Sequence, residues 1–198
     1  MVSVPTRERN KRGEGERLRE ALLDAASSLL AEGGDIERLS IRAVTARAGV
    51  TATALYLHFS DKDDLGRELK KRCFAELGDV LAAAEERHAG DPLKQLHAMG
   101  LAYLGYAREH PGHYALMFQP AKRKPRRAAP ADVRAAGAAL LSRVAEAVAR
   151  LVGDGAEAHE AAAALWLALH GRAAIEQAMP FFEFSADATY VERLLNRL

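Results

Sequence analysis

The segment 39–65, LSIRAVTARAGVTATALYLHFSDKDDL, constrains the fold of this chain more than any other. Ser40 and Thr51 can each cap a short helix, because a side-chain oxygen accepts a hydrogen bond from the unpaired N–H groups of a first helical turn. Gly49 lies between them and suits a turn that requires a positive φ angle. Two short helices joined by such a turn form a helix-turn-helix, whose second helix can enter the major groove of DNA.

Apolar side chains recur through this segment at helical spacing, so we expect them to form its core. They are Ile41, Val44, Ala48, Val50, Leu55 and Phe59. We expect the second helix to run from Thr51 to about His58 and to read DNA, because the small residues at its front allow close approach to base edges. Basic and hydroxyl side chains around it can bind phosphate. The predicted DNA-binding residues are Ser40, Arg42, Arg47, Thr51, Thr53, Ala54, Tyr56, His58 and Lys62.

A helical corner of this kind also occurs in proteins that do not bind DNA, since short motifs produce false matches. The overall charge leaves both interpretations open, because 28 Lys and Arg residues against 27 Asp and Glu residues give a formal net charge of +1. A DNA-binding surface must therefore be a local patch. The near-neutral charge argues against a protein that coats DNA regardless of sequence, because such binding depends on many phosphate contacts.

Helical periodicity continues through the rest of the chain, and no segment has the alternation of a strand. We expect Ser60 to open a long helix, with Asp63 three positions later as in a capping box. The predicted fold is all-α: an N-terminal three-helix helix-turn-helix domain and a C-terminal helical domain for ligand binding and dimerisation. The expected helices span about 16–32, 40–47, 51–58, 60–88, 92–108, 131–152 and 156–179, and a short helix closes the chain.

The predicted domains are a flexible basic arm (1–14), the helix-turn-helix domain (15–62) and a regulatory and dimerisation domain (63–198). A second basic stretch, 119–131, carries three prolines and five basic residues and is expected to be an exposed loop. Both the arm and the loop could reach DNA or remain solvated.

Several classes of protein are disfavoured by the sequence. A single cysteine, Cys73, excludes an intramolecular disulfide and a cysteine-clustered metal site, and we expect it to be a buried, inert thiol. There is no phosphate loop, nucleophile elbow or evident carboxylate pair, so we predict neither an enzyme nor a cofactor, and no metal site. No apolar stretch is long enough to cross a bilayer and residues 1–16 do not resemble a signal peptide, so a cytoplasmic protein without membrane contact is expected.

Residues 16–65 resemble the DNA-binding domain of the TetR family of bacterial repressors. The family pattern is matched by Leu39-Ser40, by Ala48-Gly49-Val50-Thr51, by Leu55-Tyr56-Leu57-His58-Phe59 and by Lys62-Asp63-Asp64-Leu65. Thr45 departs from it, since the family often has alanine there. The resemblance implies that Thr51, Thr53, Ala54, Tyr56 and His58 face DNA and that Lys62 contacts its backbone.

Two C-terminal stretches, 106–118 and 165–171, resemble a TetR subgroup named for a Trp-His-Gly signature, here Trp166, His170 and Gly171. The resemblance implies a homodimer through the helices at about 131–152 and 156–179 and a pocket for a small-molecule effector. Independently, the second of these helices is apolar on all sides, as in helices buried against a partner. The predicted ligand-binding residues are Tyr103, Tyr106, Met117, Phe118, Trp166, His170 and Phe181, with Tyr114, Phe182 and Glu176 as further candidates.

The sequence therefore predicts a homodimeric, ligand-responsive transcriptional regulator that represses by binding a palindromic operator in double-stranded DNA and is released by a small molecule. The alternative is a helical ligand-binding protein or an enzyme with a vestigial DNA-binding head. For any one aromatic candidate, a plain core position is the competing interpretation, because aromatic side chains at helical spacing often serve only packing.

Overall fold

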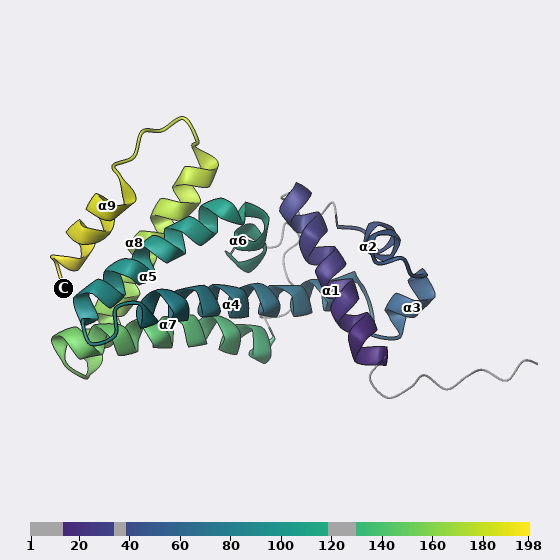
Figure 1. The fold of residues 1–198 in the computed structure, drawn as a ribbon, viewed down its shortest axis with the longest axis horizontal. Coiled ribbons are helices and arrows are strands. Elements are labelled where there is room, and N and C mark those ends of the chain that lie inside the picture. Colours follow the sequence, from purple (N-terminus) through teal and green to yellow (C-terminus); the bar gives the residue numbers. More distant parts are fainter. Residues whose placement is uncertain (1–13, 34–38, 119–129) are drawn as a thin grey trace, which may run out of the picture. The chain divides into compact units, whose positions relative to one another are not determined.

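The computed structural model describes residues 14–33, 39–118 and 130–198 (Figure 1). Every regular element in these ranges is a helix, which confirms the predicted all-α fold. The predicted arm up to residue 13 and the predicted basic loop up to residue 129 lie outside the described residues. None of the described helices is long and apolar enough to span a membrane. The helices are α1 (Glu14–Gly33), α2 (Ile41–Ala48), α3 (Ala52–Tyr56), α4 (Lys62–Glu86), α5 (Pro92–Glu109), α6 (Pro111–Phe118), α7 (Ala131–Val152), α8 (Ala156–Ala178) and α9 (Asp187–Leu195).

The chain divides into two compact units between Leu69 and Lys70. The division falls within α4, which runs through it as one continuous helix (Figure 1). The domain boundary predicted from the sequence lies nearer the start of this helix, at residue 62.

The first unit is built around a small apolar core to which each of its helices contributes. Helix α1 packs against α2, and α2 against α3. Its almost fully buried large side chains are Leu22, Leu30, Val44, Leu55, Phe59, Leu65 and Leu69. Three of the six predicted core residues of the motif, Val44, Leu55 and Phe59, are thus buried, whereas Ile41, Ala48 and Val50 are half-buried.

Helix α5 organises the second unit, because it packs against α6, α7, α8 and α9, while α7 packs along α8. Its start is as predicted, with Asp91 accepting a hydrogen bond from the Lys94 N–H at 3.1 Å and Pro92 in the first turn. Helix α9 approaches α5 closely at Gly100, where an added Cβ would lie 2.8 Å from a methyl carbon of Val191. Glycine at this position is therefore required by space.

A buried arginine connects α8 to the segment that leads into α9. The Arg172 guanidinium pairs with Glu176, lies 3.2 Å from a carboxylate oxygen of Asp187, and donates to the Ser185 carbonyl at 2.8 Å. It also lies over the ring of Phe184, with 4.6 Å between the guanidinium carbon and the ring centroid. Because both charge and hydrogen-bonding capacity are satisfied, this cation is tolerated in a largely buried position.

Candidate nucleic-acid interface

Helix α2, the first of the helix-turn-helix, is capped at both ends. Ser40 Oγ accepts a hydrogen bond from the Ala43 N–H at 3.1 Å, as its predicted N-cap position requires. At the other end, Gly49 has a φ angle of 69°, in the left-handed region that favours glycine. Its N–H donates to the Ala46 carbonyl at 3.3 Å. The turn between the two helices is therefore fixed by local hydrogen bonds.

Thr45 is buried in α2, at the position where the resemblance favours alanine. Its hydroxyl donates to the Ile41 carbonyl at 2.9 Å and lies 3.2 Å from the Arg42 carbonyl. Threonine can satisfy its hydroxyl on the preceding turn of its own helix in this way. The departure from the pattern thus leaves no buried polar atom without a partner at this residue.

Helix α3 spans Ala52–Tyr56, so the predicted extent of 51–58 is too long. Thr51 caps it by accepting a hydrogen bond from the Ala54 N–H at 3.3 Å. Leu55 is fully buried and anchors the helix to the core, whereas Thr51 and Thr53 are exposed. A single buried leucine therefore fixes which face of α3 is presented to solvent.

The residues that follow extend this exposed surface. Tyr56 keeps 55% of its surface accessible and Leu57 68%. Leu57 is absent from the sequence-based prediction, although its position two residues after Leu55 takes it off the buried face of a helix. His58 is half-buried beside the start of α1, since a Cβ on Gly15 would lie 3.6 Å from a ring carbon of His58.

Arg47, one of the predicted phosphate contacts, forms a two-pronged ion pair with Glu32 at the end of α1. The two guanidinium nitrogens lie 2.7 and 2.9 Å from the two carboxylate oxygens. These hydrogen bonds lower the pKa of the Glu32 carboxyl and raise the pKa of Arg47. Contact with DNA by Arg47 would therefore compete with a contact inside the first unit. Arg42 is also exposed on α2.

The start of α4 differs from the prediction, because Asp61 and not Ser60 provides its cap. Asp61 accepts a hydrogen bond from the Asp64 N–H at 2.7 Å. The Asp64 carboxylate reaches back to the Ser60 N–H at 2.9 Å. The predicted pair of Ser60 and Asp63 is thus shifted by one residue, and Lys62 becomes the first residue of the helix.

Arg19 of α1 supports this corner from within the first unit. It pairs with Glu68 of α4 and lies over the ring of Phe59, with 5.5 Å between the guanidinium carbon and the ring centroid. A cation over an aromatic face is attracted by the ring electrons. The helix-turn-helix is therefore fixed to both the preceding and the following helix.

The second unit contains an aromatic cluster that brings together several predicted ligand-binding residues. The Tyr103 and Tyr114 hydroxyls lie 3.1 Å apart, and His170 Nδ1 lies 2.6 Å from the Tyr114 hydroxyl and 3.3 Å from that of Tyr103. Trp166 stacks on His170 with 5.5 Å between ring centroids, and Phe118 meets His170 at 4.7 Å. Helices α5, α6 and α8 all contribute to this cluster.

Burial keeps the polar groups of the cluster uncharged. It raises the pKa of Tyr114 to about 12 and also raises that of Tyr103, while it lowers the pKa of His170. At neutral pH, the three side chains therefore form a hydrogen-bonded network without net charge.

The remaining predicted ligand-binding residues differ in their surroundings. Met117 is buried, whereas Phe181 is 81% exposed. Tyr106 points elsewhere: its ring packs against His110 with 4.8 Å between centroids, and its hydroxyl is 3.5 Å from the Cys73 carbonyl. The enclosed space next to the network, bordered by Tyr103 and Trp166, has a volume of only ≈ 20 Å³.

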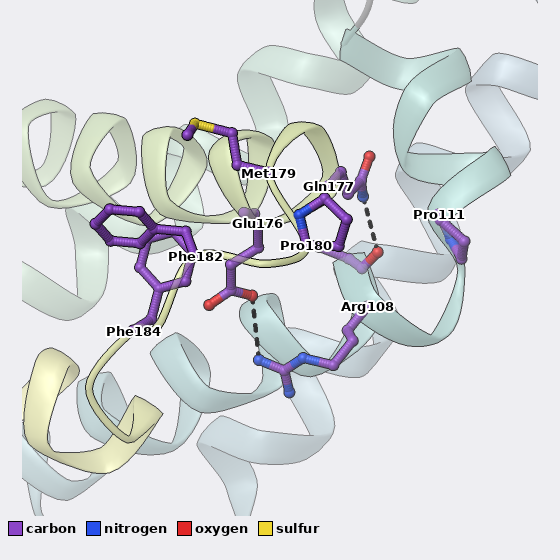
Figure 2. Close-up of a pocket in the computed structure, with 10 residues that line it drawn as sticks. Arg108, Pro111, Glu176, Gln177, Met179, Pro180, Phe182 and Phe184 are labelled. Carbon is purple, nitrogen blue, oxygen red and sulfur yellow. Dashed lines mark hydrogen bonds and ion pairs between the residues drawn. The ribbon is translucent and has the colours of Figure 1, made fainter.

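A larger, open groove of ≈ 310 Å³ lies at the end of α8 (Figure 2). Arg108 and Glu176 form an ion pair at 3.3 Å across it, and Gln177 donates to the Ala107 carbonyl at 2.9 Å. Glu176 and Phe182 are candidates from the sequence, but the groove itself has no sequence signature, because its walls come from segments distant in sequence. Its lining comprises Ala107, Arg108, Pro111, Ala173, Glu176, Gln177, Met179, Pro180, Phe182 and Phe184.

Both units match known families. Residues 22–69 match a family described as bacterial regulatory proteins, tetR family. Residues 96–198 match one described as tetracyclin repressor-like, C-terminal domain. The chain belongs to the TetR family. Assignment to the Trp-His-Gly subgroup stays a prediction.

Relatives of this TetR-family chain are transcriptional regulators. It is 38% identical over 72 residues to an uncharacterized HTH-type transcriptional regulator of Haemophilus influenzae, a match that covers 36% of this chain and only 35% of that protein. It is 28% identical over 178 residues to another of Mycobacterium tuberculosis, covering 89% of this chain and 78% of that protein. The crystal structure of a TetR-like transcriptional regulator from Rhodococcus sp. RHA1 is 25% identical, with a TM-score of 0.64 and coverage of 96% of this chain and 97% of that one.

Membership of the TetR family identifies the chain as a transcriptional regulator whose first unit is its DNA-binding domain. The matched span 22–69 includes all the residues predicted to bind DNA.

Proposed function

We propose that the protein is a homodimeric repressor that binds a near-palindromic operator and is released by a small molecule. The observation that carries this proposal is the exposed surface of α3, where Thr51, Thr53 and Tyr56 face solvent while Leu55 holds the helix to the core. This surface belongs to a motif matched by a family of bacterial regulatory proteins. Regulation of transcription places its action in the cytoplasm, where the DNA lies.

In this proposal, α3 enters the major groove. Thr51, Thr53 and Ala54 contact base edges, because threonine hydroxyls donate or accept and threonine and alanine methyls can meet the thymine methyl. Tyr56 and His58 reach the phosphates from the end of the helix. Ser40, Arg42, Arg47 and Lys62 bind the backbone on either side, where contacts position the helix without reading sequence.

The proposed dimer interface lies on α7 and α8, which carry apolar side chains that a single chain leaves uncovered. Leu167 is 60% exposed, and Ile175, Leu151 and Val152 are also exposed. Between them, the outer faces of both helices carry small residues, among them Ala138 on α7 and Ala164 on α8, which permit close approach of another helix. Exposed large apolar side chains on two helices that pack against each other are typical of a protein–protein interface.

The proposed effector site is the aromatic cluster around His170. The ≈ 20 Å³ cavity beside it, lined by residues of α4, α5, α7 and α8, holds about one water molecule, so a drug-sized ligand requires these helices to separate. A ligand that binds only the open arrangement would shift the population of the two arrangements. Because α4 runs from this unit into the DNA-binding unit, such a change can reach the reader through one helix.

The test is binding of the purified protein to DNA from around its own gene, with a scrambled competitor and a salt series. We expect two chains, or a multiple of two, on a near-palindromic site. Tyr56→Ala should weaken this binding without changing the oligomeric state measured by sedimentation, and Tyr190→Ala, in the second unit, serves as the matched control. Weak binding that ignores sequence and depends steeply on salt would overturn the proposal.

A further inference from the structure

A cluster of three side chains of metal-binding types lies in the second unit and shares no residue with the aromatic network. Cys73 and Glu76 lie on α4, three residues apart, and therefore on one face of the helix. His113 comes from α6. One ligand atom of each residue, the thiol sulfur, a carboxylate oxygen and a ring nitrogen, lies within 4.8 Å of the other two.

The two oxygens of the Glu76 carboxylate have different neighbours. Oε1 accepts from the Arg72 guanidinium at 3.3 Å, on the same helix. Oε2 lies 3.9 Å from His113 Nδ1. The ion pair with Arg72 involves Oε1 and leaves Oε2 next to the His113 imidazole, where it can serve as a metal ligand.

We propose that Cys73, Glu76 and His113 form a binding site for a divalent ion of the zinc class. Zinc binds Cys, His and Glu at about 2.0–2.3 Å, so the ligand atoms of a tetrahedral site are roughly 3.3–3.8 Å apart. The present separations of up to 4.8 Å require shifts of about 1 Å. Three protein ligands leave the fourth position for water or another donor.

The donor set selects among metals. A thiolate excludes magnesium and calcium, which take oxygen ligands, and a single thiolate with one imidazole and one carboxylate suits zinc and its spectroscopic substitute cobalt. On binding, the metal–sulfur bond replaces the S–H bond of Cys73 and the proton leaves to solvent. The resulting thiolate and the Glu76 carboxylate together balance the two positive charges of the ion, so the complex itself is neutral.

The surroundings of Cys73 argue against a reactive thiol. Burial, followed by the charge of Glu76, raises the pKa of Cys73 to about 12. A thiol with a raised pKa is a poor nucleophile and a poor target for oxidation. The negative charge of Glu76 disfavours a thiolate at Cys73 when no metal is bound. With a divalent ion between them, both negative groups would instead be attracted to the ion.

Neighbouring side chains pack around the proposed ligands. The His110 ring stacks on that of His113, with 5.6 Å between centroids and 16° between planes. The Tyr106 hydroxyl lies 3.5 Å from the carbonyl oxygen of Cys73 and donates to it. Groups around a metal site that fix the orientation of its ligands contribute to metal affinity.

The experiment uses the full-length protein without DNA, so its outcome does not depend on the proposed function. Reduced, chelator-treated protein is titrated with cobalt(II) alone. We expect one ion per chain, intense visible bands typical of tetrahedral cobalt, a sulfur-to-cobalt charge-transfer band in the near ultraviolet, and displacement of cobalt by zinc.

Variants assign the ligands. Glu76→Gln and His113→Gln should each lower cobalt affinity by more than the roughly 10–100-fold that loss of an outer neighbour causes. Cys73→Ala should also abolish the charge-transfer band. Glu86→Gln on the exposed end of α4 and His159→Gln on α8 are the matched controls and should bind as the wild type does. Circular dichroism establishes that each variant is folded. Absence of the band in the wild type, its survival in Cys73→Ala, or equal losses in the control variants would overturn the proposal.

Discussion

The two units of this protein are held together over very different distances along the chain. In the helix-turn-helix, Ser40, Thr51 and Asp61 each cap a helix by a bond to a residue three positions away. In the second unit, the Tyr114 hydroxyl meets His170 across 56 residues and Arg108 meets Glu176 across 68. The exposed surface of the helix-turn-helix is therefore specified by local contacts, whereas the second unit forms only when helices distant in sequence pack together. Substitutions of exposed residues in the first unit should therefore change DNA binding with little change in stability. Substitutions of buried residues in the second unit should change the stability of its helix packing.

The largest loss of stability is expected at Leu55, because this residue alone anchors α3 to the core of the first unit. Leu55→Ala should destabilise the first unit by about 2–5 kcal/mol, because it removes a fully buried leucine from a small core. Leu57→Ala, two residues away and exposed, should change stability by less than about 0.5 kcal/mol. Urea unfolding followed by circular dichroism measures both. Equal losses of stability in the two variants would contradict the burial of Leu55 and the exposure of Leu57 on α3.

The next effect tests the network of the second unit. Tyr114→Phe should destabilise that unit by roughly 1–3 kcal/mol, because it leaves His170 Nδ1 without its 2.6 Å partner in a partly buried site. Thermal unfolding gives the shift. Tyr190→Phe removes a hydroxyl bonded to the Ala168 carbonyl, in a more exposed position, and should have a smaller effect. An unchanged melting temperature for Tyr114→Phe would show that water readily replaces the tyrosine.

A pair of glycines on α5 measures the closeness of packing. Gly100→Ala should destabilise the protein by about 1–3 kcal/mol through overpacking against Val191, partly offset by the better helix propensity of alanine. Gly105→Ala, on the same helix with no described atom within 4 Å of the added carbon, should instead stabilise by up to about 1 kcal/mol. Chemical unfolding of both variants distinguishes the steric overlap with Val191 from the gain in helix propensity. Stabilisation by both would place α9 farther from α5.

The pH dependence of stability sharpens the contrast further. Because the pKa of His170 is lowered in the folded protein, the unfolded chain binds its proton first as the pH falls through the ordinary histidine value of about 6.5. The folded state should therefore lose stability below that pH and regain it above. The slope of melting temperature against pH should become shallower in His170→Gln. A slope that is identical in both proteins would contradict a buried, neutral His170.

The smallest effect concerns a surface pair in the first unit. Glu32→Gln should release Arg47 from its two-pronged pair and raise affinity for DNA a few-fold. If the released arginine binds one further phosphate, the slope of log K against log salt should steepen by about 0.9. Binding titrations at several salt concentrations measure this, with Glu20→Gln on α1 as the control. An unchanged slope would remove Arg47 from the predicted contacts.

The same difference in distance explains what could be predicted from the sequence. Ser40, Gly49, Thr51 and Asp91 were readable because a cap or turn involves residues three or four positions apart. The cap of α4 was misplaced by one residue, since Ser60 is followed by three aspartates that can all cap a helix. Where several neighbouring residues could cap a helix with similar energy, the sequence pattern does not determine which of them does so.

Side-chain direction in the assembled unit was harder to predict. Tyr103 and Trp166, both predicted to bind ligand, line the same cavity, whereas Tyr106, on the same helix as Tyr103, points toward Cys73. The grouping of Cys73 with His113 had no signal in the sequence, because α5 separates them along the chain. Contacts of this kind depend on the rotation of each helix about its axis, which spacing alone does not determine.

The small volume enclosed beside Tyr103 and Trp166 also has a kinetic consequence. A molecule larger than water needs the surrounding helices to move apart, so under the proposed function the frequency of that opening limits how fast an effector associates. At high effector concentration, the observed rate should stop rising and become equal to the opening rate. The response time of the regulator would then depend on how often its own helices separate and not on the concentration of effector in the cell.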